Sequence, residues 1–251
     1  MKIHKYHSCE NSFLIVEDLK DEDSFVLVKR LCQEYQVDGL LVFKNDPMEM
    51  LVFNRDGSEA NMCGNGIRCL MNYIAYNYGN YQSANIKTKA GIYTCEVLNE
   101  NPFISVVGFD VGNFIEDIIR KDVVIKDKTF NITLFELGVL HAIVMSDDFN
   151  LDERYILDIF NHPLLGGKTN INLVKRLNGN VFEIMTYERG VGFTRACGTG
   201  VAASGYVLYT LFNMESNLTA ICPGGILKVD IDDKIYLIGE SNYVGTYEIE
   251  L

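Results

Sequence analysis

The feature of this sequence that most constrains its fold is an internal repeat. When residue n is aligned with residue n+134, Cys63 falls on Cys197 and the next glycine, Gly64, falls on Gly198. The same register matches further pairs: Gly66 with Gly200, Phe53-Asn54-Arg55 with Tyr187-Glu188-Arg189, Gly91-Ile92 with Gly225-Ile226, and His7 with His141. Several ungapped matches in one register predict that the chain contains two halves of similar fold.

The predicted order of strands and helices supports this interpretation. Short apolar or alternating runs typical of strands occupy 11–17, 38–44 and 49–54, then 139–146, 171–176 and 181–187. Apolar residues at helical spacing predict an early helix in each half, around 25–35 and 156–160. A longer helix follows each Cys-Gly element, at 67–78 with Gly79 as its cap and at 199–212, before strand pairs that turn near Gly91 and Gly225.

The second long helix has apolar or small residues nearly all round, which indicates a helix surrounded by sheet. The sequence therefore predicts an α/β fold of two pseudo-symmetric halves, each a mixed β-sheet or barrel wrapped around a central helix. We expect the halves to span 1–112 and 113–240, with a final strand at 241–251 that crosses back to the first half.

Composition excludes several classes of function. The net charge of −12 argues against a nucleic-acid partner, which needs clustered Lys and Arg. The longest uncharged apolar stretch, 201–212, is too short to span a bilayer, and Met1-Lys2-Ile3-His4-Lys5 does not resemble a signal peptide. Seven cysteines without a CxxC pair indicate reduced thiols in a cytoplasmic protein and argue against a structural metal site.

Each repeated element places a cysteine, Cys63 or Cys197, immediately before Gly-x-Gly at the start of a helix. The first amides of a helix lack internal partners and carry partial positive charge, so we expect them to lower the pKa of each thiol and to bind a carboxylate. A single Cys-Gly-x-Gly is more often a packed cysteine at a turn, but two copies in register favour a paired site. The other cysteines are interpreted as small buried hydrophobic residues: Cys9, Cys32, Cys69, Cys95 and Cys222.

Two such elements facing each other suit the inversion of a stereocentre. The reaction needs a base on one face of the carbon and an acid on the other, and two cysteines can exchange these roles. The helix-start amides can stabilise the enolate-like transition state. Because no phosphate loop or metal cluster is evident, we expect no cofactor and no metal.

The sequence resembles the diaminopimelate epimerase family, cofactor-independent epimerases with two catalytic cysteines. The most specific segments are NRDGSEANMCGNGIRC at 54–69 and YERGVGFTRACGTG at 187–200, and 11–13, 169–172 and 222–225 add weaker support. The resemblance implies the epimerisation of LL- to meso-diaminopimelate for lysine and cell-wall synthesis, in a protein that can form a homodimer.

The resemblance also implies roles for individual residues. Cys63 and Cys197 match the catalytic pair. Glu188 matches a carboxylate that lies near the second cysteine and binds the substrate amine. His141 matches a histidine that helps the first cysteine ionise. Arg189 matches the residue that takes the distal carboxylate. The remaining substrate-binding matches are Asn11, Asn54, Gly64, Asn65, Asn170, Gly198 and Thr199. Arg68, one turn into the first long helix, is consistent with a solvated side chain.

Two departures from the family loosen the substrate assignment. Glu10-Asn11-Ser12 stands where the family usually has Gly-Asn-Asp, and Val139-Leu140 stands where it often has Asn-Pro before the histidine. A racemase of another amino acid on the same fold remains an alternative, although the proline-racemase branch fits Asn65 and Glu188 poorly. A non-catalytic amino-acid-binding protein, with the two cysteines as a redox latch, is the alternative from another class.

Overall fold

A computed structural model describes residues 1–17, 19, 24–79, 81–99, 104–111, 118–147, 149 and 153–249. Its contacts divide the chain into two compact units, Met1–Asp110 with Ile238–Leu251, and Val111–Leu237. The expected boundary between residues 112 and 113 lies outside the described residues. The final strand of the chain belongs mostly to the first unit, where it pairs with the N-terminal strand.

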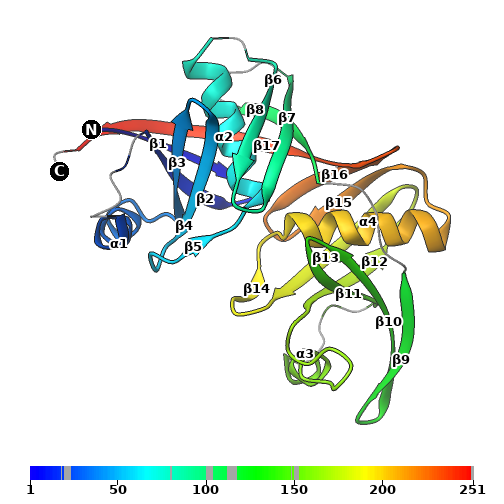
Figure 1. Cartoon of the computed structure of the whole chain (residues 1–251). Coiled ribbons are helices and arrows are strands. Elements are labelled where there is room, and N and C mark those ends of the chain that lie inside the picture. The colour runs from blue at the N-terminus through cyan, green and yellow to red at the C-terminus, as the bar shows by residue number, and fades with distance from the viewer. Residues whose placement is uncertain are drawn as a thin grey trace. The chain divides into compact units, whose positions relative to one another are not determined.

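The first unit is a ring of strands around one helix. Its elements are β1 (Lys2–Ser8), β2 (Asn11–Glu17), α1 (Ser24–Glu34), β3 (Gly39–Asn45), β4 (Met48–Asn54), β5 (Glu59–Ala60), α2 (Gly64–Asn77), β6 (Ser83–Thr88), β7 (Gly91–Asn99), β8 (Ile104–Asp110) and the larger part of β17 (Ile235–Glu248). Pairing runs β17–β1–β2–β3–β4–β6–β7–β8 and returns to β17. The helix α2 contacts β1, β2, β3, β4, β7 and β8, and its Asn72 bonds to Ser241 on β17, so α2 lies at the centre of the ring (Figure 1).

The second unit repeats this arrangement around α4. Its elements are β9 (Ile119–Ile125), β10 (Lys128–Leu137), β11 (Val139–Met145), α3 (Glu153–Phe160), β12 (Asn170–Arg176), β13 (Val181–Glu188), β14 (Gly192–Thr194), α4 (Gly198–Phe212), β15 (Asn217–Cys222) and β16 (Gly225–Ile231). The strands pair in the order β9–β10–β11–β12–β13–β15–β16, with β14 on β13. The helix α4 contacts β10, β11, β12, β15 and β16. The predicted fold class is confirmed.

The two units match strand by strand. In each unit, a helix connects two parallel strands, β2 and β3 or β11 and β12. An antiparallel strand, β4 or β13, follows and forms a hairpin with a short strand, β5 or β14, just before the central helix. Close packing of α4 requires its glycine: a Cβ added at Gly205 would lie 3.0 Å from Val229 on β16. Such a small residue lets the sheet approach the helix on that side.

The repeat register of 134 residues holds from β4 onward but not upstream. Phe53 on β4 pairs with Leu40, and its match Tyr187 pairs with Ile171, so β3 and β12 are offset by fewer residues. Continuing to the next strand, the counterpart of His141 on β11 is Phe13 on β2. The expected match of His7 with His141 is therefore wrong, because the β3–β4 and β12–β13 turns differ in length, as do the connections that carry α1 and α3.

Candidate active site

Cys63 is the N-cap of α2. Its backbone is extended, with φ −141° and ψ 118°, and its Sγ accepts a hydrogen bond from the Gly66 amide at 3.4 Å. The side chain is half-buried. The thiol therefore takes the place of the hydroxyl or carboxylate that usually satisfies the first helical amides.

Cys197 is the N-cap of α4, with φ −110° and ψ 109°, and its side chain is buried. Its Sγ lies 3.6 Å from Thr199 Oγ1. Burial, and then the Glu188 carboxylate, raise the pKa of this thiol to about 12. The expectation that the helix start lowers its pKa is wrong for Cys197, because desolvation and a like charge outweigh the partial charge of the amides.

Glu188, the last residue of β13, is the acidic partner of this thiol. Burial raises the pKa of its carboxyl, and hydrogen bonds from Thr194 and Cys197 partly offset that effect. Thr194 Oγ1 donates to Glu188 Oε1 at 2.6 Å. The structure thus brings together two predicted residues, Glu188 and Cys197, as a coupled acid–base pair that disfavours two negative charges.

A buried polar network lies beside the start of α4. Thr186 Oγ1 donates to Asn172 Oδ1 at 2.9 Å, and Asn172 Nδ2 lies 3.2 Å from His141 Nδ1. Because the amide nitrogen is only a donor, His141 Nδ1 accepts and the ring carries its proton on Nε2. Burial lowers the pKa of His141 to about 3, so the ring is neutral. Asn172 Oδ1 occupies the space that a side chain at Gly200 would need.

Asn170 and Arg189 also meet within the second unit. The backbone amide of Arg189 donates to Asn170 Oδ1 at 3.0 Å, which ties the start of β12 to the turn after β13. The Arg189 side chain is exposed. Gly198 and Thr199 are half-buried in the first turn of α4. The predicted second-half residues thus gather around one helix start, apart from the exposed guanidinium.

In the first unit, Asn11 begins β2 directly after a tight turn. Cys9 and Glu10 both have positive φ, 50° and 59°, a conformation that favours glycine. Glu10, where the resemblance leads one to expect glycine, thus has a backbone conformation that glycine adopts more readily. Asn11 Oδ1 is buried without a partner among the described residues, whereas exposed Asn54 donates to Ser58 Oγ at 3.0 Å. Cys9 is half-buried, not fully buried as expected.

Arg68, in the second turn of α2, differs from what its sequence position predicted. Its side chain is fully buried, not solvated. The guanidinium donates to Ser8 Oγ at 3.0 Å, to Asn65 Oδ1, and to Cys9 Sγ at 3.8 Å. A helical side chain leans toward the helix N-terminus, which is how Arg68 reaches Asn65 one turn earlier. The spacing of three residues on one helix face was the available signal.

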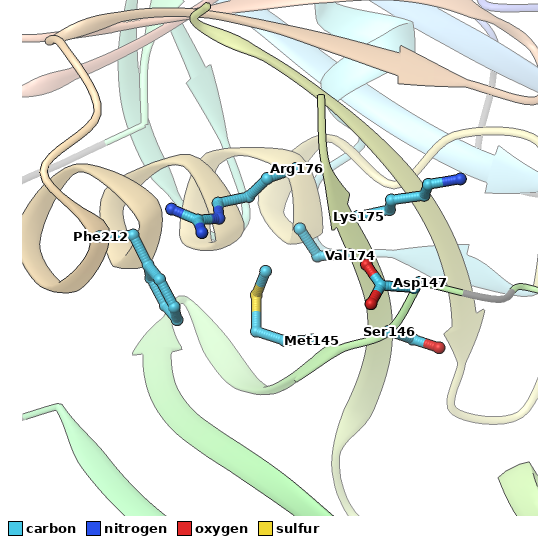
Figure 2. A pocket seen from close by; sticks show the side chains of 7 residues that line it. All are labelled: Met145, Ser146, Asp147, Val174, Lys175, Arg176 and Phe212. Carbon is cyan, nitrogen blue, oxygen red and sulfur yellow. The ribbon is translucent and has the colours of Figure 1, made fainter. Parts of the chain in front are cut away.

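A shallow hollow of about 260 Å³ lies elsewhere on the second unit. Its lining comes from the ends of β11 and β12 and from Phe212, at the opposite end of α4 from Cys197 (Figure 2). The full lining is Met145, Ser146, Asp147, Val174, Lys175, Arg176 and Phe212. This hollow is therefore not part of the cysteine site.

Within the described residues, no group of three or more His, Cys, Asp or Glu side chains is placed to hold a metal ion. None of the helices in that part of the chain has the length and apolar composition needed to cross a membrane.

Sequence relatives agree on one family. The family model for diaminopimelate epimerase matches residues 3–114 and again 133–244. The chain is 33% identical to the diaminopimelate epimerase of Clostridium perfringens, covering 98% of this chain and 99% of that protein. It is 32% identical to the enzyme of the same name from Caldanaerobacter subterraneus, with full coverage of both, and 27% identical to that of Methanocaldococcus jannaschii, covering 100% and 98%.

Solved structures share the fold at low sequence identity. A probable proline racemase from Agrobacterium radiobacter superposes with a TM-score of 0.70 at 11% identity, covering all of this chain and 93% of the other. A hydroxyproline epimerase from Agrobacterium vitis gives 0.68 at 12% identity, with 98% and 91% coverage. From the family match over both halves and the full-length relatives, the chain belongs to the diaminopimelate epimerase family of isomerases.

Proposed function

We propose that this protein interconverts LL- and meso-diaminopimelate by passing a proton between Cys63 and Cys197. The observation that carries the proposal is the placement of each cysteine as the N-cap of the central helix in one of two matching units. Full-length similarity to proteins named diaminopimelate epimerase supports the substrate.

In the proposed reaction one thiolate removes the α-proton and becomes a thiol. The α-carbon carbanion, delocalised into the carboxylate, then takes the proton of the other thiol on the opposite face. The second cysteine becomes the thiolate, so protons and charge balance over one inversion. The next turnover begins from the opposite substrate or after proton exchange with water.

The acid–base pair of the second unit supports different starting roles for the two cysteines, one as the acid and the other as the base. Because burial and Glu188 hold the pKa of Cys197 high, its thiol is protonated in the free enzyme. Cys63, half-buried and bonded to a helix amide, is then the base that begins the reaction. When the direction reverses, Glu188 takes the Cys197 proton in this proposal, supported by the hydrogen bond between the two side chains.

We propose that the helix-start segments hold the reacting end of the substrate. Amides of Gly64 and Asn65, and of Gly198 and Thr199, lie in the first turns of α2 and α4, where backbone donors stabilise a carboxylate. Asn11 Oδ1, a buried acceptor without a partner among the described residues, can accept a hydrogen bond from the substrate amine. Asn54 and Asn170 complete this proposed contact set.

A substrate panel tests the assignment. One stereoisomer each of diaminopimelate, glutamate, histidine and lysine is incubated with purified enzyme, with no pyridoxal phosphate, metal or nucleotide added, and the isomers are separated. We expect inversion of diaminopimelate alone, unchanged after dialysis against a chelator. Faster inversion of another amino acid, or activity that only a restored metal recovers, would contradict the proposal.

Arg189 provides a sharper test of the distal carboxylate. The planar fork of arginine binds a carboxylate through two parallel hydrogen bonds, which lysine does not reproduce. Arg189→Lys should therefore lower kcat/KM for diaminopimelate about ten- to a hundredfold, as expected for one lost charge-assisted hydrogen bond. A harmless exchange would remove the reason for assigning a dicarboxylate.

One observation keeps a second candidate open. Val139, at the start of β11, is 41% exposed and stands where the family often has an asparagine that helps hold the distal end. A racemase of another amino acid fits this change, and the substrate panel would reveal it. A binding protein without catalysis would show no deuterium uptake at any substrate α-carbon.

A further inference from the structure

Arg68 carries a buried positive charge at the first helix start that the proposed reaction does not use. Its side chain is 0% exposed, and none of the ion pairs formed among the described residues includes it. Its Nη1 is buried without a hydrogen-bond partner in the same part of the chain. A buried cation without a counter-ion is costly. An anion that is present only in some states of the site, such as an ionised side chain or a bound ligand, would compensate this charge.

The contacts of Arg68 join two segments that both contain proposed substrate-binding residues. Nη2 donates to Asn65 Oδ1 in the first turn of α2, so the amide of Asn65 has its oxygen toward the guanidinium and its donor end away from it. Nε donates to Ser8 and Nη2 to Cys9, at the turn that leads into Asn11.

The described start of α4 has no cation at the position equivalent to Arg68. The repeat register places Ala202, which is fully buried, opposite Arg68. Both helices therefore begin with a cysteine, but only α2 has a cation one turn behind it. A requirement of the fold alone does not explain the difference, because α4 is enclosed by its sheet without an arginine.

We propose that Arg68 is a positioning residue for the reacting end of the substrate: it orients the Asn65 amide as a donor and sets a positive charge behind the helix start that holds Cys63. The anions it compensates are the Cys63 thiolate and the substrate α-carboxylate. This inference rests on the proposed function for its substrate part only.

Other titratable groups near the guanidinium do not compete in the neutral range. Burial raises the pKa of the Cys9 thiol, and that of Cys69 to about 12. Glu240 acts on Cys9 from an exposed position. The neighbouring thiols therefore stay neutral while Cys63 ionises.

The charge is tested without substrate, by the pH dependence of iodoacetamide alkylation at Cys63, mapped by peptide mass spectrometry. In Arg68→Met the midpoint should rise by about one pH unit, a tenfold loss of thiolate at fixed pH, whereas Arg68→Lys should keep it near wild type. Alkylation of Cys197 in the same samples is the internal reference and should not move. Arg30→Met, an exposed arginine on α1, is the matched control.

The orientation of Asn65 is tested with LL-diaminopimelate. Both Arg68 variants lack the guanidinium fork, so each should raise KM about tenfold, while Arg30→Met should not. If Arg68→Met does not fold, Arg68→Lys is sufficient: a kept alkylation midpoint with a raised KM supports the proposal, and a wild-type KM overturns it. A folded Arg68→Met with an unchanged midpoint overturns the charge role. If wild-type protein does not epimerise diaminopimelate but the midpoint still shifts, only the proposed function fails.

Discussion

The starts of α2 and α4 have the same backbone and opposite surroundings. Each begins at an N-cap cysteine followed by Gly-x-Gly. Behind Cys63 lies the buried cation of Arg68, whereas Cys197 lies beside the carboxylate of Glu188, which helps raise its pKa. A repeated fold therefore supplies two equivalent positions with different charges around them, and we propose that this difference makes Cys63 easier to ionise than Cys197.

The two units also differ in the polarity of the strand residues near each helix start. The buried network of His141, Asn172 and Thr186 has purely apolar counterparts in the first unit, and pairing identifies them as Phe13, Leu41 and Val52. Leu41 contacts the start of α2 at Gly66, just as Asn172 contacts the start of α4 at Gly200. The fold thus tolerates either filling at this place, so the polar one is a feature of the second site.

Removing either cysteine should have the largest effect. Cys63→Ala or Cys197→Ala leaves one face of the carbon without an acid or base, and positioned proton transfer contributes roughly 10²–10⁴-fold to rate. We expect losses of that order in kcat with unchanged far-ultraviolet circular dichroism. Near-wild-type turnover by either folded variant would contradict the two-thiol mechanism.

Making the second unit resemble the first tests the buried network. Asn172→Leu leaves His141 and Thr186 without their shared partner, at about 1–3 kcal/mol for each buried group left unsatisfied. The triple variant His141→Phe, Asn172→Leu, Thr186→Val restores the filling of the first unit and should recover much of that stability. Urea unfolding measures both, and a triple variant less stable than the single one would show that the two units are not interchangeable.

Glu188→Gln removes the like charge beside Cys197. The pKa of Cys197 should fall by about one unit, so its alkylation at fixed pH should become faster while that of Cys63 stays unchanged. The matched control is Glu183→Gln, the same substitution on the same strand. Glu183 is not among the groups that shift the pKa of Cys197. An unchanged Cys197 profile in Glu188→Gln would mean that burial alone keeps this thiol protonated.

The neutral His141 makes the stability of the fold depend on pH. Its pKa is lowered to about 3 in the folded state, so between about pH 6.5 and 3 the unfolded chain binds one more proton than the folded one. Stability should therefore fall as pH decreases through this window, by at most about 1.4 kcal/mol per pH unit from this group. His141→Phe in the triple variant should reduce that slope. An identical slope would assign the acid sensitivity to other groups.

Much of the fold follows from sequence patterns. The Cys-Gly repeat, the strand alternation and the nearly all-apolar helix that became α4 were sufficient to predict two matching halves around central helices. The upstream register was not predictable in this way, since a single histidine match carries no information about the lengths of the β3–β4 and β12–β13 turns or of the connections through α1 and α3.

The site was predictable in its residue types and less so in its electrostatics. The helix-start argument identifies both cysteines, but it cannot anticipate that Cys197 is buried beside Glu188, because burial depends on the whole sheet. Arg68 was misjudged for a related reason: its place on a helix face does not tell whether a strand turn covers it. Asn172 lies in the weakly matching segment 169–172, but its part in the site became visible only through its contacts with His141 and Gly200.

The central claim, that two different thiols act on opposite faces of one carbon, is tested most directly by isotope partition in D2O. Wild-type enzyme is given LL-diaminopimelate, and deuterium is measured early in both the meso product and the remaining LL substrate. The account predicts product that carries one solvent deuteron while the remaining substrate stays unlabelled, because the proton removed on one face is not the one returned on the other. Equal labelling of substrate and product from the start, or inversion without deuterium uptake, would indicate a single base and contradict the account.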